Sequence, residues 1–125
     1  MHMKVLLSIK PEFVEKIFAG EKKFEYRRTI FKKDVESIVV YSTKPEGKIV
    51  GELFIEYILN DSPESIWSST QKDSGISYSF FQEYFGDRTE GYAIKISRAV
   101  QYEQPYDPVM QDSNFRAPQS FCYID

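Results

Sequence analysis

The sequence predicts one α+β domain, mainly β with helices, in which a curled sheet or small barrel has helices over its openings. Three observations favour this fold class. Short apolar or alternating runs, which are typical of strands, recur along the chain. Aromatic residues make up 16% of the composition, and Phe and Tyr both favour strands. One helical pattern follows the first strand, and two more lie together in the middle of the chain.

The first two predicted elements are a buried strand and a short helix. Residues 4–9 (KVLLSI) form a continuous apolar run of strand length. Residues 11–20 (PEFVEKIFAG) place Pro11 at a first helical position and Gly20 where helices commonly end. The large apolar residues between them fall on one stripe, so we expect this helix to pack on the sheet.

The next segment is a short, highly charged strand. Residues 22–28 (KKFEYRR) alternate after Lys22, which lies in the turn that leaves the helix. Strand alternation places the two aromatic residues on one face and Glu25 and Arg27 on the other.

Two more strands follow before a change of character. Residues 35–43 (VESIVVYST) are mostly apolar and predict a central strand. Residues 48–59 (KIVGELFIEYIL) predict a long strand, in which Gly51 indicates a bulge or a close backbone approach.

A helical insertion separates these strands from the last ones. Asp61 or Ser62 caps a helix that Gly75 ends, and residues 77–86 (SYSFFQEYFG) predict a second helix. The aromatic stripe of the second helix is typical of core packing, although a surface position would make it a protein-docking face.

The C-terminal part returns to strands. Residues 90–97 and 99–106 alternate, three prolines punctuate an irregular stretch, and residues 119–124 (QSFCYI) predict a closing strand.

Length and charge bound the class of protein. A chain of 125 residues is one domain, which we assign to residues 3–125, with Met1 and His2 as an expression-derived start. The net charge of −3 excludes a uniformly basic nucleic-acid binder. Residues 22–33, however, hold six of the sixteen Lys and Arg residues and a single acid, so anion binding would have to be local.

The numbers of cysteines and histidines exclude an internal disulfide and a zinc site built from these residues. Cys122 is the only cysteine and His2 the only histidine, so the sequence offers no internal disulfide and no zinc-ligand spacing, and we expect neither a metal nor a cofactor. No apolar run approaches the roughly 18 residues that cross a bilayer, and we expect a cytoplasmic protein without a membrane partner.

The charged segment belongs to a wider pattern. Residues 6–28 carry G-x-K-x-x-E-x-R as Gly20, Lys22, Glu25 and Arg27, and SIKP, IVVYST, VGE and PQSF occur elsewhere in the chain. This pattern resembles the ASCH domain, a branch of the PUA-like superfamily. The resemblance implies a small β-barrel with flanking helices and a cleft beside the first helix that binds RNA or a nucleotide-like ligand.

The resemblance also leaves a small hydrolase open. One reported activity of the family removes the acyl group of N4-acylated cytidine with a lysine and a threonine of this segment. Lys22 matches the lysine, but Glu25 stands in the threonine position. The other is RNA cleavage. Lys22 and Glu25 would be the catalytic residues in either case, whereas the residue types alone favour a binding module.

The residues themselves suggest how such a cleft would work. Arg27 presents a planar fork of donors suited to a phosphate or a base edge, and Glu25 can accept from an exocyclic amine or pair with Arg27. An exposed pair would contribute only ~0–1 kcal/mol. We expect the site to be completed by residues from three further segments: Ser8, Lys10, Tyr41, Ser42, Gln119 and Ser120. The oligomeric state stays open.

Overall fold

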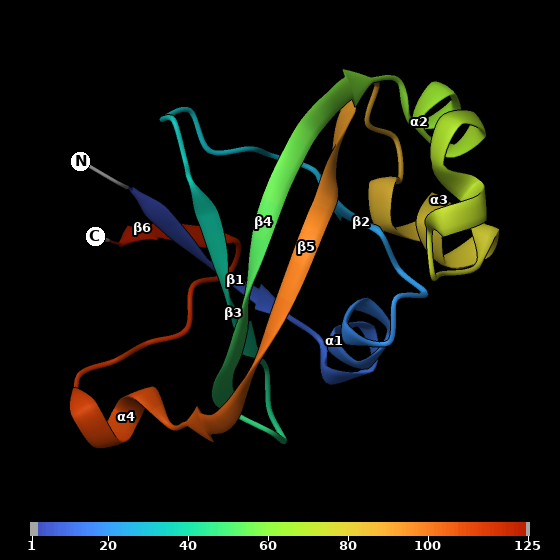
Figure 1. Ribbon diagram of the computed structural model, residues 1–125. Coiled ribbons are helices and arrows are strands. Elements are labelled where there is room, and N and C mark those ends of the chain that lie inside the picture. Colours follow the sequence, from blue (N-terminus) through green and yellow to red (C-terminus); the bar gives the residue numbers. More distant parts are fainter. Residues whose placement is uncertain (1–2, 125) are drawn as a thin grey trace.

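The computed structural model describes residues 3–124, so Met1 and His2, the expected expression-derived start, lie outside it, as does Asp125. Figure 1 shows a curled sheet with helices on two sides. The elements in chain order are β1 (Lys4–Ile9), α1 (Pro11–Phe18), β2 (Phe24–Arg27), β3 (Ser37–Ser42), β4 (Lys48–Asp61), α2 (Pro63–Thr70), the 3₁₀ turn η1 (Gln71–Asp73), α3 (Tyr78–Phe85), β5 (Gly91–Tyr106), α4 (Pro108–Gln111) and β6 (Phe121–Ile124).

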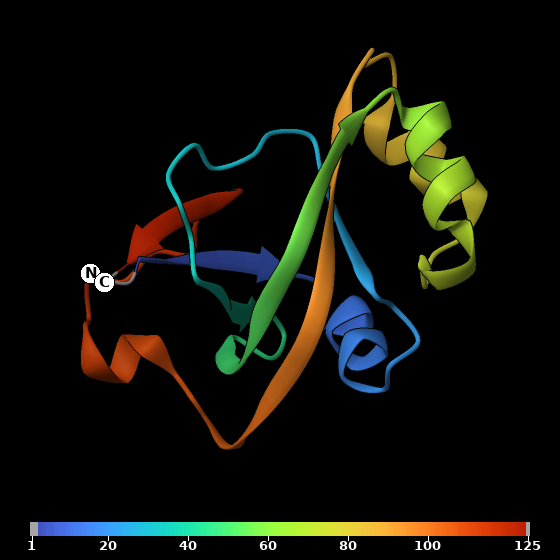
Figure 2. The same ribbon diagram turned by 45° about the horizontal axis from the view of Figure 1, so that its top comes forward.

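The six strands form one mixed sheet in the order β2-β5-β4-β3-β1-β6. β1 and β3 are parallel, with Ser8 opposite Tyr41, and the other neighbours are antiparallel. The sheet curls into a half-barrel, which confirms the predicted fold class. α1, α2 and α3 lie on one side of it and α4 on the other (Figures 1 and 2).

Side chains close the gap between the two edge strands, β2 and β6. An Nη2–H of Arg27 donates to the Ser120 carbonyl at 3.1 Å. Just past β2, the backbone N–H of Lys32 donates to the Tyr123 hydroxyl at 2.7 Å. Among the described residues no backbone ladder joins β2 to β6, so these side-chain contacts bridge the two edges of the half-barrel.

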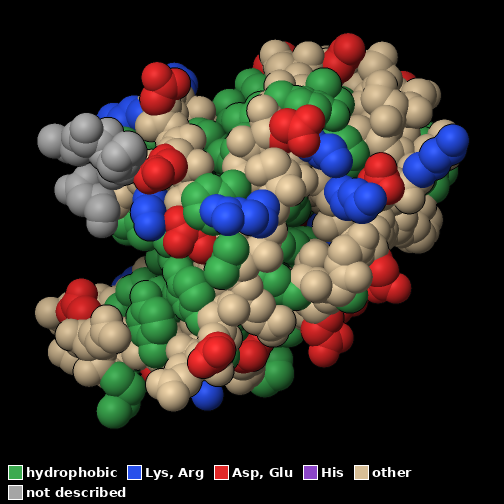
Figure 3. All heavy atoms as spheres, in the orientation of Figure 1, with side chains coloured by type: hydrophobic (Ala, Val, Ile, Leu, Met, Phe, Trp, Pro, Cys, Tyr) green, Lys and Arg blue, Asp and Glu red, His purple; other side chains and the backbone are tan. Residues whose placement is uncertain are grey.

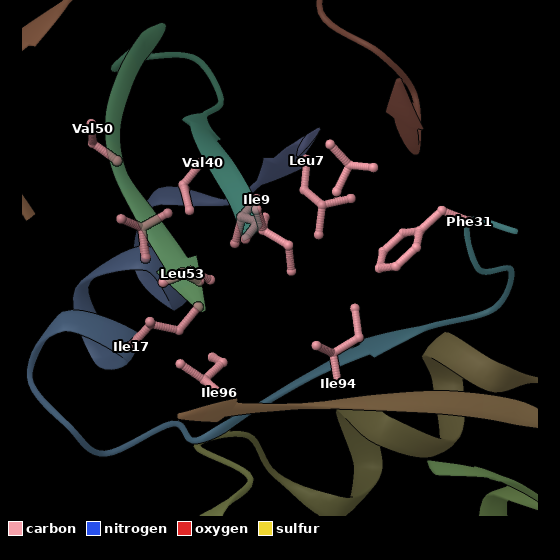
Figure 4. Packing of buried hydrophobic residues seen from close by; sticks show 12 residues of the cluster. Leu7, Ile9, Ile17, Phe31, Val40, Val50, Leu53, Ile94 and Ile96 are labelled. Carbon is pink, nitrogen blue, oxygen red and sulfur yellow. The ribbon is translucent and has the colours of Figure 1, made fainter. Parts of the chain in front are cut away.

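The main core lies inside the curl of the sheet. Figure 4 shows aliphatic side chains from β1, β3, β4 and β5 meeting Ile17 of α1, with Phe31 at one end. Six side chains of this core are at most 1% exposed: Val5, Leu7, Ile38, Val40, Leu53 and Ile94. Burial of side chains of this size stabilises a fold by roughly 1.5–3 kcal/mol each.

A second, aromatic core holds the helical insertion. Phe24 and Tyr26 of β2 pack with Phe81 and Phe85 of α3, and both α3 rings are 2% exposed. This burial confirms the predicted core role for Phe81 and Phe85, whereas Phe80 and Tyr84 of the same stripe are only partly buried. Trp67 of α2 packs on Phe81, with ring centroids 4.9 Å apart.

Local sequence explains the helix ends. Pro11 and Pro63 occupy first-turn positions, and the Ser62 hydroxyl accepts from the Ser65 N–H at the start of α2. The first insertion helix ends at Thr70 and continues as η1, so it is shorter than the span to Gly75.

Two strands, β5 and β4, add detail to the predictions. β5 runs unbroken over what the sequence divides into two strands, and the short helix α4 follows it. Gly51 confirms both expectations: the register of β4 shifts beside it, and a Cβ there would lie 2.5 Å from the Val100 carbonyl oxygen.

None of the helices in the described part of the chain is long and apolar enough to span a membrane.

Candidate functional site

A cleft of about 570 Å³ opens at the seam of the half-barrel. Its floor comes from β2, and its walls come from the junction of β1 with α1, from α3, and from the segment that precedes β6. The lining residues are Ser8, Ile9, Lys10, Phe13, Lys22, Glu25, Tyr26, Arg27, Arg28, Thr29, Ile76, Phe80, Tyr84, Arg88, Gln119 and Ser120. Figures 1 and 2 show α1, β2 and α3 grouped on one side of the molecule.

The cleft is cationic although the chain is acidic. Its lining holds five cations, which are Lys10, Lys22, Arg27, Arg28 and Arg88, and a single carboxylate, that of Glu25. The whole chain carries a formal net charge of −3. A hollow lined by one sign of charge focuses the field and attracts ions of the opposite sign, so this cleft favours anionic guests.

Arg27 is fixed at the floor by three contacts. Its Nη1 lies 3.1 Å from the Glu25 Oε2, and its Nη2 donates to both the carbonyl and the hydroxyl of Ser120, at 3.1 and 3.2 Å. Arg27 and Glu25 are 9% and 6% exposed. This buried pair corrects the picture of a solvated strand, because removing Arg27 would leave a buried carboxylate unpaired and would also open the seam.

Lys22 is the most buried cation of the cleft. It is 3% exposed, and its ammonium donates to the Phe24 carbonyl at 2.7 Å and the Ser74 carbonyl at 3.2 Å. The Nζ also lies 4.7 Å from the centre of the Tyr26 ring. Burial lowers the pKa of Lys22 below its ordinary value, against the opposing attraction of Glu25.

Lys22 also joins β2 to the helical insertion. Besides its bond to Ser74, the Lys23 backbone N–H donates to the Asp73 carbonyl at 2.8 Å, and Lys16 of α1 donates to the Gly75 carbonyl at 2.9 Å. Three consecutive carbonyls of the insertion thus accept from this segment and α1, which fixes α3 beside the cleft.

α3 supplies an aromatic wall. Phe81 and Phe85 point into the core, whereas Phe80 and Tyr84, one position earlier in each turn, line the cleft. Lys10 lies over the Phe80 ring at 5.6 Å, and the Arg28 guanidinium lies over the Tyr84 ring at 4.8 Å. Two cation–π pairs therefore lie along this wall of the cleft.

The structure brings together seven of the nine predicted site residues. Lys22, Glu25, Arg27, Ser8, Lys10, Gln119 and Ser120 all line the cleft. The Ser8 hydroxyl donates to the Pro118 carbonyl at 2.8 Å, which places the segment before β6 against the end of β1.

Tyr41 and Ser42 lie outside the cleft, and their assignment to it is a correction. Tyr41 is 7% exposed and packs with Leu6 and Ile49 on the opposite face of the sheet, its ring 5.5 Å from that of Phe115. Ser42 is completely buried. Strand alternation sends these neighbours to opposite faces, and neither side chain is among the residues that line the cleft.

Several residues that line the cleft are not among the predicted site residues. Phe80, Tyr84 and Arg88 come from the helical insertion, and Arg28 follows β2 directly. The four-residue spacing of Phe80 and Tyr84 placed them on a common helix flank, but only the packing of α3 against β2 shows that this flank faces the cleft.

A second hollow of about 380 Å³ lies on the other side of the sheet, between β1, the end of β5 and α4. Its lining is largely apolar and includes Leu6, Tyr102 and Phe115. Figure 3 shows this hollow on the left of the molecule, flanked by hydrophobic side chains, whereas basic and acidic groups are interspersed over the rest of that face.

A curled six-stranded sheet with flanking helices and a cationic cleft at its seam defines the chain as a small α+β domain. The ASCH domain family matches residues 7–107, and the chain belongs to this family. The crystal structure of ASCH from Zymomonas mobilis superposes with a TM-score of 0.89 at 24% identity, covering 98% of this chain and 87% of that one. This likeness shows the shared fold.

Two relatives show how much of other proteins this chain matches in sequence. The ASCH domain-containing ribonuclease of Zymomonas mobilis is 27% identical over 128 residues, which cover 97% of this chain and 84% of that protein. The ATP synthase subunit alpha of Ureaplasma parvum is 29% identical over 121 residues, which cover 96% of this chain and 15% of that protein. The chain thus matches nearly the whole of the first relative and only a small part of the second.

Proposed function

We propose that this ASCH domain binds single-stranded RNA, or a nucleotide-like ligand, in the seam cleft. The observation that carries the proposal is the charge of the lining, five cations against one carboxylate in a chain of net charge −3. Lys and Arg that neutralise phosphates supply most of the affinity of proteins for nucleic acids. The relative named as a ribonuclease supports RNA as the polyanion.

The aromatic wall supports an unpaired ligand in particular. Phe80 and Tyr84 border the cleft, and unpaired bases stack on such rings for about 1–3 kcal/mol each. A cleft of about 570 Å³ has the size of pockets that enclose small molecules, so it accommodates a nucleotide unit but not a duplex. Glu25 would then accept from a donor on the base, while Arg27 faces a phosphate or an acceptor.

RNA cleavage is the second candidate function, and two observations favour it. The relative that matches 97% of this chain is named a ribonuclease. In addition, Lys22 is a buried lysine whose pKa is lowered, next to a carboxylate, which is a setting that suits acid–base chemistry. Against this role, the Lys22 ammonium already donates to two backbone carbonyls, so its contacts are those of a structural clamp.

Deacylation of N4-acylated cytidine is the remaining alternative in the same cleft. Lys22 is present for it, but Glu25 stands where that branch of the family uses a threonine, and a carboxylate has no hydroxyl with which to attack an acyl group. The geometry therefore supports this reaction less than it supports binding.

One set of measurements separates the three functions. Binding of a fluorescein-labelled single-stranded RNA is followed by anisotropy at several salt concentrations, beside a duplex of the same sequence. The same RNA is incubated with the protein and analysed for shorter products, and N4-acetylcytidine is analysed for cytidine. We expect single-strand binding with a log–log salt slope that corresponds to at most five neutralised phosphates.

The variants must keep a positive charge beside Glu25, because Arg27 and Glu25 form a buried ion pair at the cleft floor. Arg27→Lys keeps a positive charge beside Glu25 but loses the planar fork, and we expect it to weaken RNA binding about tenfold. Arg98→Ala is the matched control, since Arg98 is an exposed arginine that lies over the Phe54 ring outside the cleft. Equal effects of the two variants, or equal affinity for the duplex, would contradict the proposal. Products that disappear in Lys22→Met would move the assignment to the ribonuclease.

A further inference from the structure

Arg28 and Tyr84 form a preorganised layer at the rim of the cleft. The guanidinium carbon of Arg28 lies 4.8 Å from the centre of the Tyr84 ring. The backbone N–H of Arg28 donates to the Tyr84 hydroxyl at 3.2 Å, so the ring is held by its polar end as well as by its face. Arg28 is exposed, follows Arg27 directly in the chain, and lines the same cleft.

The Arg28 guanidinium contacts the Tyr84 ring but forms no ion pair among the described residues. Among residues 3–124, the recorded ion pairs join Lys4 to Glu52 and Arg27 to Glu25. Arg28 therefore has no carboxylate partner in the described part of the chain. An oriented but unpaired guanidinium loses little conformational freedom when a ligand arrives, which is the condition for efficient recognition.

A guanidinium that lies over an aromatic ring, as Arg28 lies over Tyr84, suits one kind of ligand. Because Arg28 is exposed and lines the cleft, a base bound there can reach the guanidinium that lies over the Tyr84 ring. Proteins that read single-stranded RNA stack splayed bases on aromatic rings and on arginine planes. A base in a duplex has its faces covered by its neighbours and cannot enter such a layer.

We propose that the Arg28–Tyr84 pair is a second subsite, which stacks the base of the nucleotide adjacent to the one bound at Arg27. This inference rests on the proposed function and narrows its ligand class. A mononucleotide fills only the floor, whereas a dinucleotide or a longer single strand also reaches the rim. The domain is then a reader of single-stranded polymer rather than a pocket for a free nucleotide.

The test compares ligand length in matched variants. Competition against the labelled RNA gives the affinities of adenosine monophosphate and of the dinucleotide ApA for the unmodified protein, Arg28→Ala, Arg28→Lys and Arg98→Ala. The unmodified protein should bind ApA about tenfold or more tightly than the mononucleotide. Arg28→Ala should remove most of that gain, so that the ratio of ApA affinity to mononucleotide affinity falls toward one, while Arg27 still holds the nucleotide at the floor.

Arg28→Lys distinguishes stacking from charge. A lysine keeps the positive charge but has no plane, so this variant should lose the length dependence as Arg28→Ala does, while Arg98→Ala should keep it. If Arg28→Lys retains the preference for ApA, or if Arg28→Ala weakens both ligands equally, Arg28 acts only through its charge and the subsite is wrong. If the unmodified protein binds neither ligand nor the labelled RNA, the proposed function itself fails.

Discussion

Gly75 offers a sharp test of how the cleft floor is held together. It lies in the connection between η1 and α3 with a φ of +68°, in the left-handed region that favours glycine. An added Cβ would lie 2.5 Å from the Cβ of Lys22 and 3.0 Å from its Cα. These atoms belong to the rigid base of the side chain and to the backbone, so the contact cannot be relieved by a rotamer change.

The expected cost of Gly75→Ala has two parts. A left-handed backbone costs a non-glycine residue roughly 1 kcal/mol or somewhat more, and forcing a methyl group into a packed site costs about 1–3 kcal/mol. We therefore expect a loss of about 2–4 kcal/mol in the free energy of unfolding. Gly20→Ala is the matched control, because Gly20 has a φ of +81° but nothing within 4 Å of an added Cβ. It should lose only the backbone part.

Urea unfolding of both variants measures this difference, with Trp67, the single tryptophan, as the fluorescent reporter at the α2–α3 interface. The slope of the free energy against urea concentration should be unchanged, so that the shift in midpoint reports stability alone. Equal losses in the two variants would show that Lys22 does not clamp the insertion as described. RNA affinity should fall in Gly75→Ala and stay unchanged in Gly20→Ala.

Two further predictions concern the same buried groups. The pKa of Lys22 is lowered on folding from an ordinary value near 10.5, so the unfolded chain binds the extra proton and stability should rise as pH rises toward that value. Urea unfolding of the unmodified protein and Lys22→Met from about pH 7 to about pH 10 should show this rise in the difference between them, and a flat or falling difference would contradict the burial of the charge. Burial raises the pKa of Tyr26 to about 12, so its hydroxyl stays protonated over this range. It donates to the Thr70 Oγ1 at 2.7 Å, since that oxygen in turn donates to a backbone carbonyl. Tyr26→Phe should lose about 1 kcal/mol in the same assay, and no loss would show that the bond contributes nothing.

Strand and helix patterns were enough to predict the fold class, whereas the candidate site was predicted through the family resemblance. The alternation of residues 22–28 and the turn position of Lys22 placed Glu25 and Arg27 together, because these relationships are local. The PQSF segment entered through the family resemblance, and Arg27 does contact Ser120 although 93 positions separate them.

The site residues that were missed or wrongly assigned depend on contacts between elements that are distant in the sequence. Arg28 and Tyr84 are 56 positions apart, and their pairing follows from how α3 packs on β2, which no periodicity encodes. The assignment of Tyr41 to the cleft was wrong for a related reason. At the end of a strand an aromatic residue suits either face of the sheet, and packing against Phe115 decides which face Tyr41 occupies. The buried state of Arg27 could not be predicted either, because its strand reads as highly charged.

Amide chemical shifts in an RNA titration test the central claim most directly. When ¹⁵N-labelled protein is titrated with single-stranded RNA, we predict that the shifted amides cluster in residues 22–29, 80–88 and 119–120, around the cleft. The amides around the second hollow, at Leu6, Tyr102 and Phe115, serve as the internal reference and should not move. Shifts centred on that hollow, or no shifts at all, would contradict binding at the seam.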